Sequence, residues 1–201
     1  SLSKCYSIID RFSEDIDLAV QFKSLSVTPS ERRQLKSTIL EVISLLNMTI
    51  LKEEEVRSRR DHNEYHIGYA NTFQGDGAMV PHIIVETIVV YRPYPCVKLN
   101  VSNYITKYLT KSNENHLIKN YELEPFEMLI QYVERTFIDK LFAICDYHLE
   151  GKYNRYSRHL YDIHMIWSSG KLNMELMKSI VSDVIKDRQR YGTRNISCQP
   201  G

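Results

Sequence analysis

Two aspartates near the start of the chain have a spacing that suits metal binding. Asp15 and Asp17 lie at positions i and i+2 of the segment RFSEDIDL, residues 11–18. From Asp15 onward polar and apolar residues alternate, which predicts a strand. Residues two apart on a strand point to the same face and lie about 6.5 Å apart along it. Both carboxylates could then reach one magnesium ion, which prefers oxygen ligands, although two solvated aspartates on an exposed strand would show the same spacing.

Glu86 is a third candidate acid. It is the only charged residue in residues 83–91, an apolar run that predicts a strand. Burial of an unpaired carboxylate is costly, so a cation or strong hydrogen-bond donors are expected beside it. Together with Asp15 and Asp17 it would complete a three-acid cluster of the kind that holds one or two metal ions during phosphoryl transfer. The alternative is a glutamate on an edge strand that faces water.

Two further charged residues lie next to apolar faces of predicted helices. Lys140 has Phe137 at i−3 and Ile144 at i+4, so its ammonium would either reach a triphosphate or extend past the apolar face into solvent. Asp162 stands at the border of another apolar face with Arg158 at i−4. An ion pair within the helix is the simpler interpretation of Asp162.

Other polar features are interpreted as structural. The pair His62-x-x-x-His66 has the spacing of some zinc proteases, but no glutamate follows His62 and the segment looks like a strand, so we expect no zinc site there. The charged run KEEEVRSRRD, residues 52–61, is interpreted as a solvated connector. The sequence GDG at residues 75–77 predicts a turn.

The pattern along the chain predicts an α+β fold, with a small mixed sheet that carries the acids and a C-terminal helical lobe. Thr28 as N-cap, Pro29 at the first helical position and Glu31 as its capping-box partner predict the start of a helix. Strands are predicted at residues 15–22, 62–71, 81–91 and near 126–133, and helices at residues 29–47, near 101–110, 134–150, 154–168 and 173–190. We predict two domains, residues 1–133 and residues 134–201, with a nucleotide in the cleft between them.

Composition limits the class of protein. The 201 residues are 43% hydrophobic and carry a net charge of +1, so no overall basic field of the kind used by dedicated nucleic-acid binders is present. The four cysteines are scattered, which argues against a disulfide scaffold and a cysteine zinc site. No apolar run approaches the roughly 18 residues needed to span a bilayer. We therefore expect a reduced, cytoplasmic protein that does not bind a membrane, and its two ends suggest a fragment.

Four segments together resemble one known family. They are RFSEDIDL at 11–18, IIVETI at 83–88, ERTFIDKLFAI at 134–144 and RHLYDIHMI at 158–166. Their order and spacing resemble the AbiEii/AbiGii-type toxins, which belong to the DNA polymerase β-like nucleotidyltransferase superfamily. The similarity covers nearly the whole chain.

The resemblance implies both site residues and a function. It assigns Asp15, Asp17 and Glu86 as metal ligands, Lys140 and Asp162 as further catalytic residues at the nucleotide site, and Ser13, Lys4 and Arg158 as nucleotide-binding residues. Relatives have a glycine pair just ahead of the segment that matches residues 1–4, so an N-terminally truncated domain is expected, and they commonly have Asp where His159 stands. The implied function is magnesium-dependent transfer of a nucleotide from a nucleoside triphosphate (NTP) to an acceptor such as tRNA, by a toxin with a cognate antitoxin.

Two other functions remain open at this stage. The chain could be a non-catalytic nucleotide- or partner-binding module of the same fold, which would release no pyrophosphate. It could also be a metal-dependent phosphodiesterase that uses the same acids, which would shorten a nucleic acid rather than lengthen it.

Overall fold

The computed structural model describes residues 1–11, 15–20, 22, 27–70, 81–89, 94–190 and 195–199. The chain divides into two compact units. One unit is Phe12–Pro93, and the other joins Ser1–Arg11 to Tyr94–Gly201. These units have other bounds than the two predicted domains, because the first residues and the segment after Tyr94 pack with the helices; the division at residue 133 stays a prediction.

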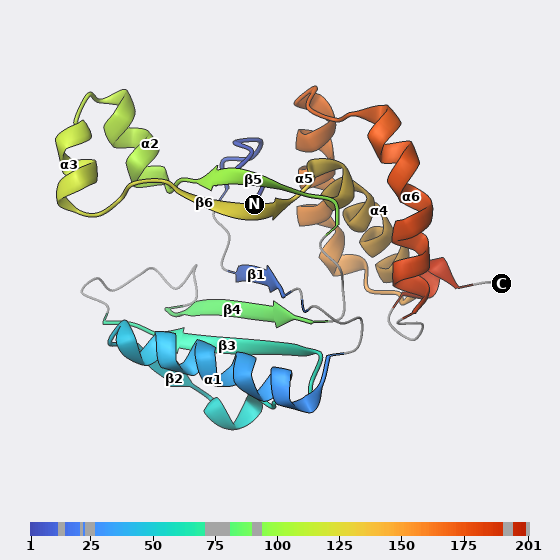
Figure 1. The fold of residues 1–201 in the computed structure, drawn as a ribbon. Coiled ribbons are helices and arrows are strands. Elements are labelled where there is room, and N and C mark those ends of the chain that lie inside the picture. The colour runs from blue at the N-terminus through green and yellow to red at the C-terminus, as the bar shows by residue number, and fades with distance from the viewer. Residues whose placement is uncertain are drawn as a thin grey trace. The chain divides into compact units, whose positions relative to one another are not determined.

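The unit Phe12–Pro93 is built on a four-stranded mixed sheet (Figure 1). Its strands are β1 (Asp15–Ala19), β2 (Thr49–Leu51), β3 (His62–Gly68) and β4 (Ile83–Ile88), in the order β1-β4-β3-β2. Strand β1 is parallel to β4, whereas β3 is antiparallel to both β4 and β2. The predicted mixed sheet and the predicted antiparallel pair are therefore confirmed, and the turn predicted at residues 75–77 lies outside the described residues. Strand β2 was not predicted.

Helix α1 (Pro29–Leu45) begins where the sequence predicts. The Thr28 hydroxyl oxygen accepts a hydrogen bond from the Glu31 amide at 3.2 Å, and the Glu31 carboxylate accepts one from the Thr28 amide at 2.8 Å. This reciprocal capping box satisfies backbone donors that the first helical turn leaves without partners. Helix α1 is followed along the chain by β2 and a short 3-10 helix, η1 (Glu53–Glu55).

Helix α1 covers one face of the sheet. Ile43 of α1 belongs to the same buried cluster as Tyr65 and Ile67 of β3, and Val85 of β4 packs against this cluster. Because side chains alternate between the two faces of a strand, the residues between these core positions belong to the other face. That other face carries the acids.

The second unit combines a two-stranded ribbon with helices (Figure 1). The ribbon pairs β5 (Cys96–Val101) with β6 (Phe126–Gln131), and it is followed by α4 (Val133–Leu149), η2 (Tyr153–Arg155), α5 (Tyr156–Ser168), α6 (Met174–Gln189) and η4 (Ile196–Cys198). Helices α2 (Tyr104–Lys111) and α3 (Asn115–Asn120) lie between the two strands in sequence. The helices predicted in this region are confirmed except for small shifts of their ends, but β5 and α3 were not predicted. Within the described ranges, no helix has the length and apolar character that crossing a bilayer would require.

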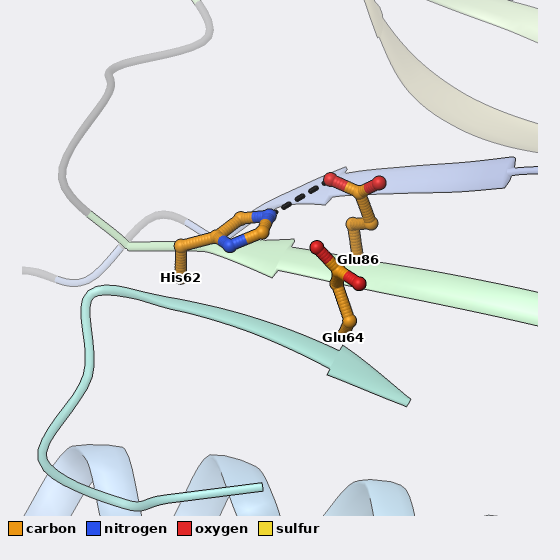
Figure 2. A group of neighbouring side chains, drawn as sticks. All are labelled: His62, Glu64 and Glu86. Atoms are coloured by element: carbon orange, nitrogen blue, oxygen red, sulfur yellow. Dashed lines mark hydrogen bonds and ion pairs between the residues drawn. The ribbon is translucent and has the colours of Figure 1, made fainter. Parts of the chain in front are cut away.

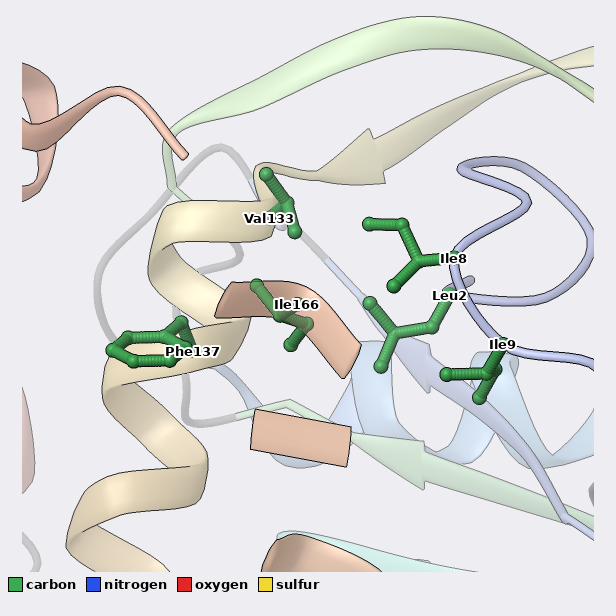
Figure 3. Packing of buried hydrophobic residues seen from close by; sticks show 6 residues of the cluster. All are labelled: Leu2, Ile8, Ile9, Val133, Phe137 and Ile166. Carbon is green, nitrogen blue, oxygen red and sulfur yellow. The ribbon is translucent and has the colours of Figure 1, made fainter. Parts of the chain in front are cut away.

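The N-terminal segment is part of the helical core (Figure 3). Leu2, Ile8 and Ile9 lie in one buried cluster with Phe137 of α4 and Ile166 of α5. Apolar burial of this kind contributes roughly 1.5–3 kcal/mol for each large side chain. It therefore fixes residues 1–11 against α4 and α5, which positions Arg11 for the contact described below.

Candidate active site

Three acidic residues form a row across neighbouring strands of the sheet. Asp17 of β1 is the register partner of Glu86 of β4, and Glu86 is also the register partner of Glu64 of β3. Residues that lie opposite each other on paired strands project from the same face, so this carboxylate row, Asp17, Glu86 and Glu64, lies on one face. Asp15 lies on that face as well, two residues before Asp17 and opposite Ile84. Like charges in such positions repel, and a cation bound between them would offset that repulsion.

His62 lies next to the carboxylate row. Its Nε2 donates a hydrogen bond to a Glu86 carboxylate oxygen at 2.8 Å, and His62, Glu64 and Glu86 each offer one ligand atom within 4.8 Å of the others. Figure 2 shows the three side chains rising to the same side of the sheet. The Glu86 side chain is 25% exposed, so it remains open to solvent although β4 is an internal strand. The edge-strand interpretation of Glu86 therefore does not apply.

The two histidines of His62-x-x-x-His66 have different partners. They lie on strand β3, as expected, where four residues span about 13 Å. His66 is hydrogen-bonded through Nδ1 to Nε2 of His82 at 2.9 Å and lies 3.6 Å from a Glu64 oxygen. Glu64 therefore contacts His66, and of the two histidines His62 is the one grouped with both Glu64 and Glu86.

Asp162 lies at the centre of a second charged group, within the other unit. Its side chain is 1% exposed, and its carboxylate accepts two hydrogen bonds from the Arg11 guanidinium, at 3.1 and 2.8 Å. The Lys140 ammonium lies 2.8 Å from the same carboxylate, and the Lys140 side chain is 19% exposed. Burial opposes ionisation of Asp162, but the hydrogen bonds from Arg11 and Lys140 outweigh it and lower the pKa of the carboxyl.

The contacts of Asp162 and Lys140 change two sequence-based interpretations. Asp162 is bound by residues from other elements, Arg11 and Lys140, so a simple pair with Arg158 within α5 does not account for its buried position. Lys140 does not extend freely into solvent but lies against a buried carboxylate. Burial and the positive charge of Lys140 also lower the pKa of the nearby His159 imidazole. This ring is therefore uncharged at neutral pH.

The remaining predicted nucleotide-binding residues are placed separately. Lys4 is exposed in the N-terminal segment, where its carbonyl oxygen accepts a hydrogen bond from the Ser102 amide at 3.0 Å. Arg158 is exposed on α5, one turn before Asp162. Ser13 lies outside the described residues.

Comparison with known proteins identifies the family. The model of the nucleotidyl transferase AbiEii toxin family, from type IV toxin–antitoxin systems, matches residues 1–198. The chain belongs to this AbiEii family. No curated protein and no solved structure matches it. Membership in the AbiEii family implies a transferase activity in general and a cognate antitoxin, and the described acids of the sheet are where a metal ion could be held.

Three residues of these two groups were missed by sequence reasoning. Glu64 and His62 belong to a strand that was predicted, but only the β3–β4 register places them beside Glu86. Arg11 begins the segment RFSEDIDL, yet its contact with Asp162 spans 151 residues of sequence. Alternation in residues 62–68 would have put His62 and Glu64 on one face, and that was the available signal.

Proposed function

We propose that this AbiEii-family protein is a metal-dependent nucleotidyltransferase that transfers a nucleotide from an NTP to an acceptor such as tRNA, as the toxin of a toxin–antitoxin system. The observation that carries the proposal is the register of β1 and β4, in which Asp17 lies opposite Glu86 on one face of the sheet. The two acids belong to segments almost 70 residues apart in sequence, so their pairing is independent of the D-x-D spacing.

The three acids predicted as metal ligands fit a hard divalent cation. Asp15, Asp17 and Glu86 offer only oxygen, the ligand type that magnesium prefers, and magnesium commonly uses one or two protein carboxylates together with water and phosphate oxygens. A bound Mg²⁺ would neutralise charge on the triphosphate.

The chemistry follows from what these residues can hold. The acceptor hydroxyl attacks the α-phosphorus of the NTP, the bond from that phosphorus to the bridging oxygen breaks, and pyrophosphate leaves with the bonding electrons. A carboxylate of the row accepts the proton of the attacking hydroxyl. Asp15, Asp17 and Glu86 orient the reacting groups, and Lys140 places a positive charge on the triphosphate.

Asp162 and Arg11 have a positioning function in this proposal. The buried Asp162 carboxylate holds the Lys140 ammonium at 2.8 Å and therefore restricts the rotamers of a long side chain. Because Arg11 occupies both carboxylate oxygens, Asp162 remains ionised and keeps its hold on Lys140.

The direct test is an assay of transfer. Incubation of the protein with total RNA, magnesium and each of the four NTPs is expected to release pyrophosphate and to increase the mass of an RNA by one or more nucleotides. Mass spectrometry of the RNA measures this increase, and omission of the metal is the control. Shortened RNA would identify a phosphodiesterase instead, and nucleotide binding without pyrophosphate release would identify a binding module.

A charge-removing variant tests the role of Lys140. Lys140→Met keeps the aliphatic stem and removes the ammonium, so NTP affinity is expected to fall. One charge-assisted contact is worth roughly 1.5–3 kcal/mol, which corresponds to about a tenfold to somewhat over a hundredfold increase in the dissociation constant. Isothermal titration calorimetry measures this change.

Lys178→Met is the matched control, because Lys178 is an exposed lysine of α6 that is paired with Glu175. This control variant should bind NTP as the wild type does. Equal dissociation constants for Lys140→Met and the wild type would remove Lys140 from the nucleotide site.

A further inference from the structure

An open cavity lies at the start of α1 in the sheet unit. It has a volume of about 510 Å³ and is lined by Pro29 and Arg33 of α1 and by Arg57, Ser58 and Arg59. The last three belong to the charged run before β3, which sequence analysis interprets as a connector. Three of the five described residues that line it are arginines in a chain whose net charge is only +1, so positive charge is concentrated here.

The segment that carries Arg57 and Arg59 is anchored by hydrogen bonds to its backbone. The buried Asn63 side chain accepts a hydrogen bond from the Arg57 amide at 2.9 Å, and the Arg32 guanidinium donates one to the Arg59 carbonyl at 3.4 Å. Val56, which precedes Arg57, is held as well, because its carbonyl accepts a hydrogen bond from the Lys36 ammonium at 2.8 Å. The cavity wall is therefore held by α1 and β3, and a ligand would not have to order it on binding.

The cations of this region fall into two groups. Arg32, Lys36 and Arg60 are engaged within the protein, with the Asp61 carboxylate and the Val56 and Glu55 carbonyls respectively. By contrast, no carboxylate of the described residues lies within ion-pair distance of Arg33, Arg57 or Arg59. The arginines that line the cavity are thus the ones whose charge the described protein leaves uncompensated.

This chemistry suits phosphate groups. Guanidinium is planar and presents a fork of N–H donors that binds phosphate oxygens in pairs, and the Ser58 hydroxyl and the positive end of the α1 dipole add to the attraction. The volume exceeds that of a single phosphate. None of the described residues that line the cavity is aromatic, so they offer no stacking platform for a base. Such a site would bind the sugar–phosphate backbone of a nucleic acid without distinguishing its base sequence.

The cavity and the carboxylate row are separate sites of one unit. Helix α1 covers the apolar face of the sheet, whereas Asp17, Glu86 and Glu64 project from the opposite face. Arg59 and Glu64 are five residues apart, so their Cα atoms lie within about 18 Å of each other. A polymer whose reacting end lies at the row therefore has phosphates further along its chain within reach of the cavity.

We propose that this arginine cavity, lined by Arg33, Arg57 and Arg59, binds backbone phosphates of a polynucleotide acceptor at a distance from its reacting end. The inference rests on the proposed nucleotidyltransferase function. It specifies the acceptor as a nucleic acid that is held through its backbone as well as through its reacting hydroxyl.

The test is a triple variant, Arg33→Gln, Arg57→Gln and Arg59→Gln. We expect its affinity for a short, fluorescently labelled single-stranded RNA of mixed sequence to fall about tenfold or more, since one charge-assisted contact alone is worth about tenfold. Fluorescence anisotropy titrations at several salt concentrations measure this. The slope of log affinity against log salt should decrease by about 0.7 for each phosphate contact removed.

The matched control changes net charge equally but leaves the cavity intact. It combines Arg60→Gln with Lys178→Gln and Lys186→Gln, three cations outside the cavity lining. Its RNA affinity should stay close to that of the wild type. Equal losses in both triple variants would mean that only net charge matters, and would overturn the proposal.

Two further probes test whether the cavity binds a different ligand, either an NTP or an acidic protein segment. Calorimetry with an NTP is expected to give the same dissociation constant for the cavity variant and the wild type; a loss there would assign the cavity to the triphosphate. Poly-glutamate binding that is lost in the cavity variant while RNA binding persists would assign it to an acidic protein segment. Failure of the wild type to bind RNA also overturns the inference. These measurements need no turnover, so they stand apart from the pyrophosphate assay that tests the proposed function.

Discussion

Asp17→Asn is expected to abolish metal-dependent nucleotide transfer while the protein stays folded. The amide keeps the size of the side chain but removes the negative charge that the carboxylate row offers to a cation. Loss of one electrostatic group of an active site commonly lowers turnover by about a hundredfold to a thousandfold. Pyrophosphate release in the presence of magnesium and NTP measures the effect.

Stability is expected to change little. Asp17 is exposed on β1 and asparagine has nearly the same size and shape, so the variant should stay folded with a stability close to that of the wild type. Magnesium should raise the melting temperature of the wild type more than that of the variant, because a ligand stabilises the state that binds it.

Asp183→Asn is the control for Asp17→Asn. It makes the same chemical change at an aspartate of α6 that is 71% exposed, and it should leave transfer and the magnesium effect unchanged. Wild-type turnover by a folded Asp17→Asn protein would rule out Asp17 as a metal ligand.

Local signals were enough for much of the fold. The capping box of Thr28 and Glu31 fixes the start of α1, and the alternation from Asp15 onward predicts β1 because both patterns act between near neighbours. Strand β5 was missed although Val97 and Leu99 alternate with polar residues, since the prolines just before it suggested an irregular segment. Strand β2 is only three residues long and has too little sequence for a periodic signal.

Only those features of the site that depend on residues close together in sequence could be predicted. The i, i+2 spacing puts Asp15 and Asp17 on one face of β1 whatever the rest of the chain does. The neighbours of Glu86 depend on the strand register. A slip of one residue in this register would move every side chain of the strand to the other face of the sheet. Spacing therefore could not predict that Glu64 lies opposite Glu86, nor that His62 donates a hydrogen bond to it.

The same limit applies to Asp162. The sequence places it at the edge of an apolar face with Arg158 as a neighbour on the same helix, because within a helix a sequence pattern predicts only contacts between residues three or four apart. The burial of Leu2, Ile8 and Ile9 against α4 and α5 is what brings Arg11 to this carboxylate. A contact of this kind follows from packing of the whole unit.

Asp162→Asn is expected to cause the largest loss of stability of the substitutions considered. The change leaves the Arg11 and Lys140 cations beside each other without their common counter-charge at a position that is 1% exposed. Removal of one partner of a buried ion pair costs about 3–5 kcal/mol, and the lower end is expected because Arg11 and Lys140 can partly turn toward water. Denaturant unfolding measures the loss. It can be followed by fluorescence of Trp167, the only tryptophan, which lies on α5 in the same unit.

The pH dependence of the wild type separates this ionic contribution from a packing defect. The folded-state pKa of Asp162 is lowered, so its contribution to stability is complete above the unfolded pKa of about 3.9 and is lost as pH falls through the folded pKa. The difference in unfolding free energy between wild type and Asp162→Asn should therefore be constant near neutral pH and shrink in acid. Asp183→Asn, which changes an exposed aspartate of α6, should show a difference close to zero throughout. A loss below about 1 kcal/mol at neutral pH, or a loss that persists undiminished in acid, would contradict the ionic role of Asp162 and leave Lys140 without the anion that orients it.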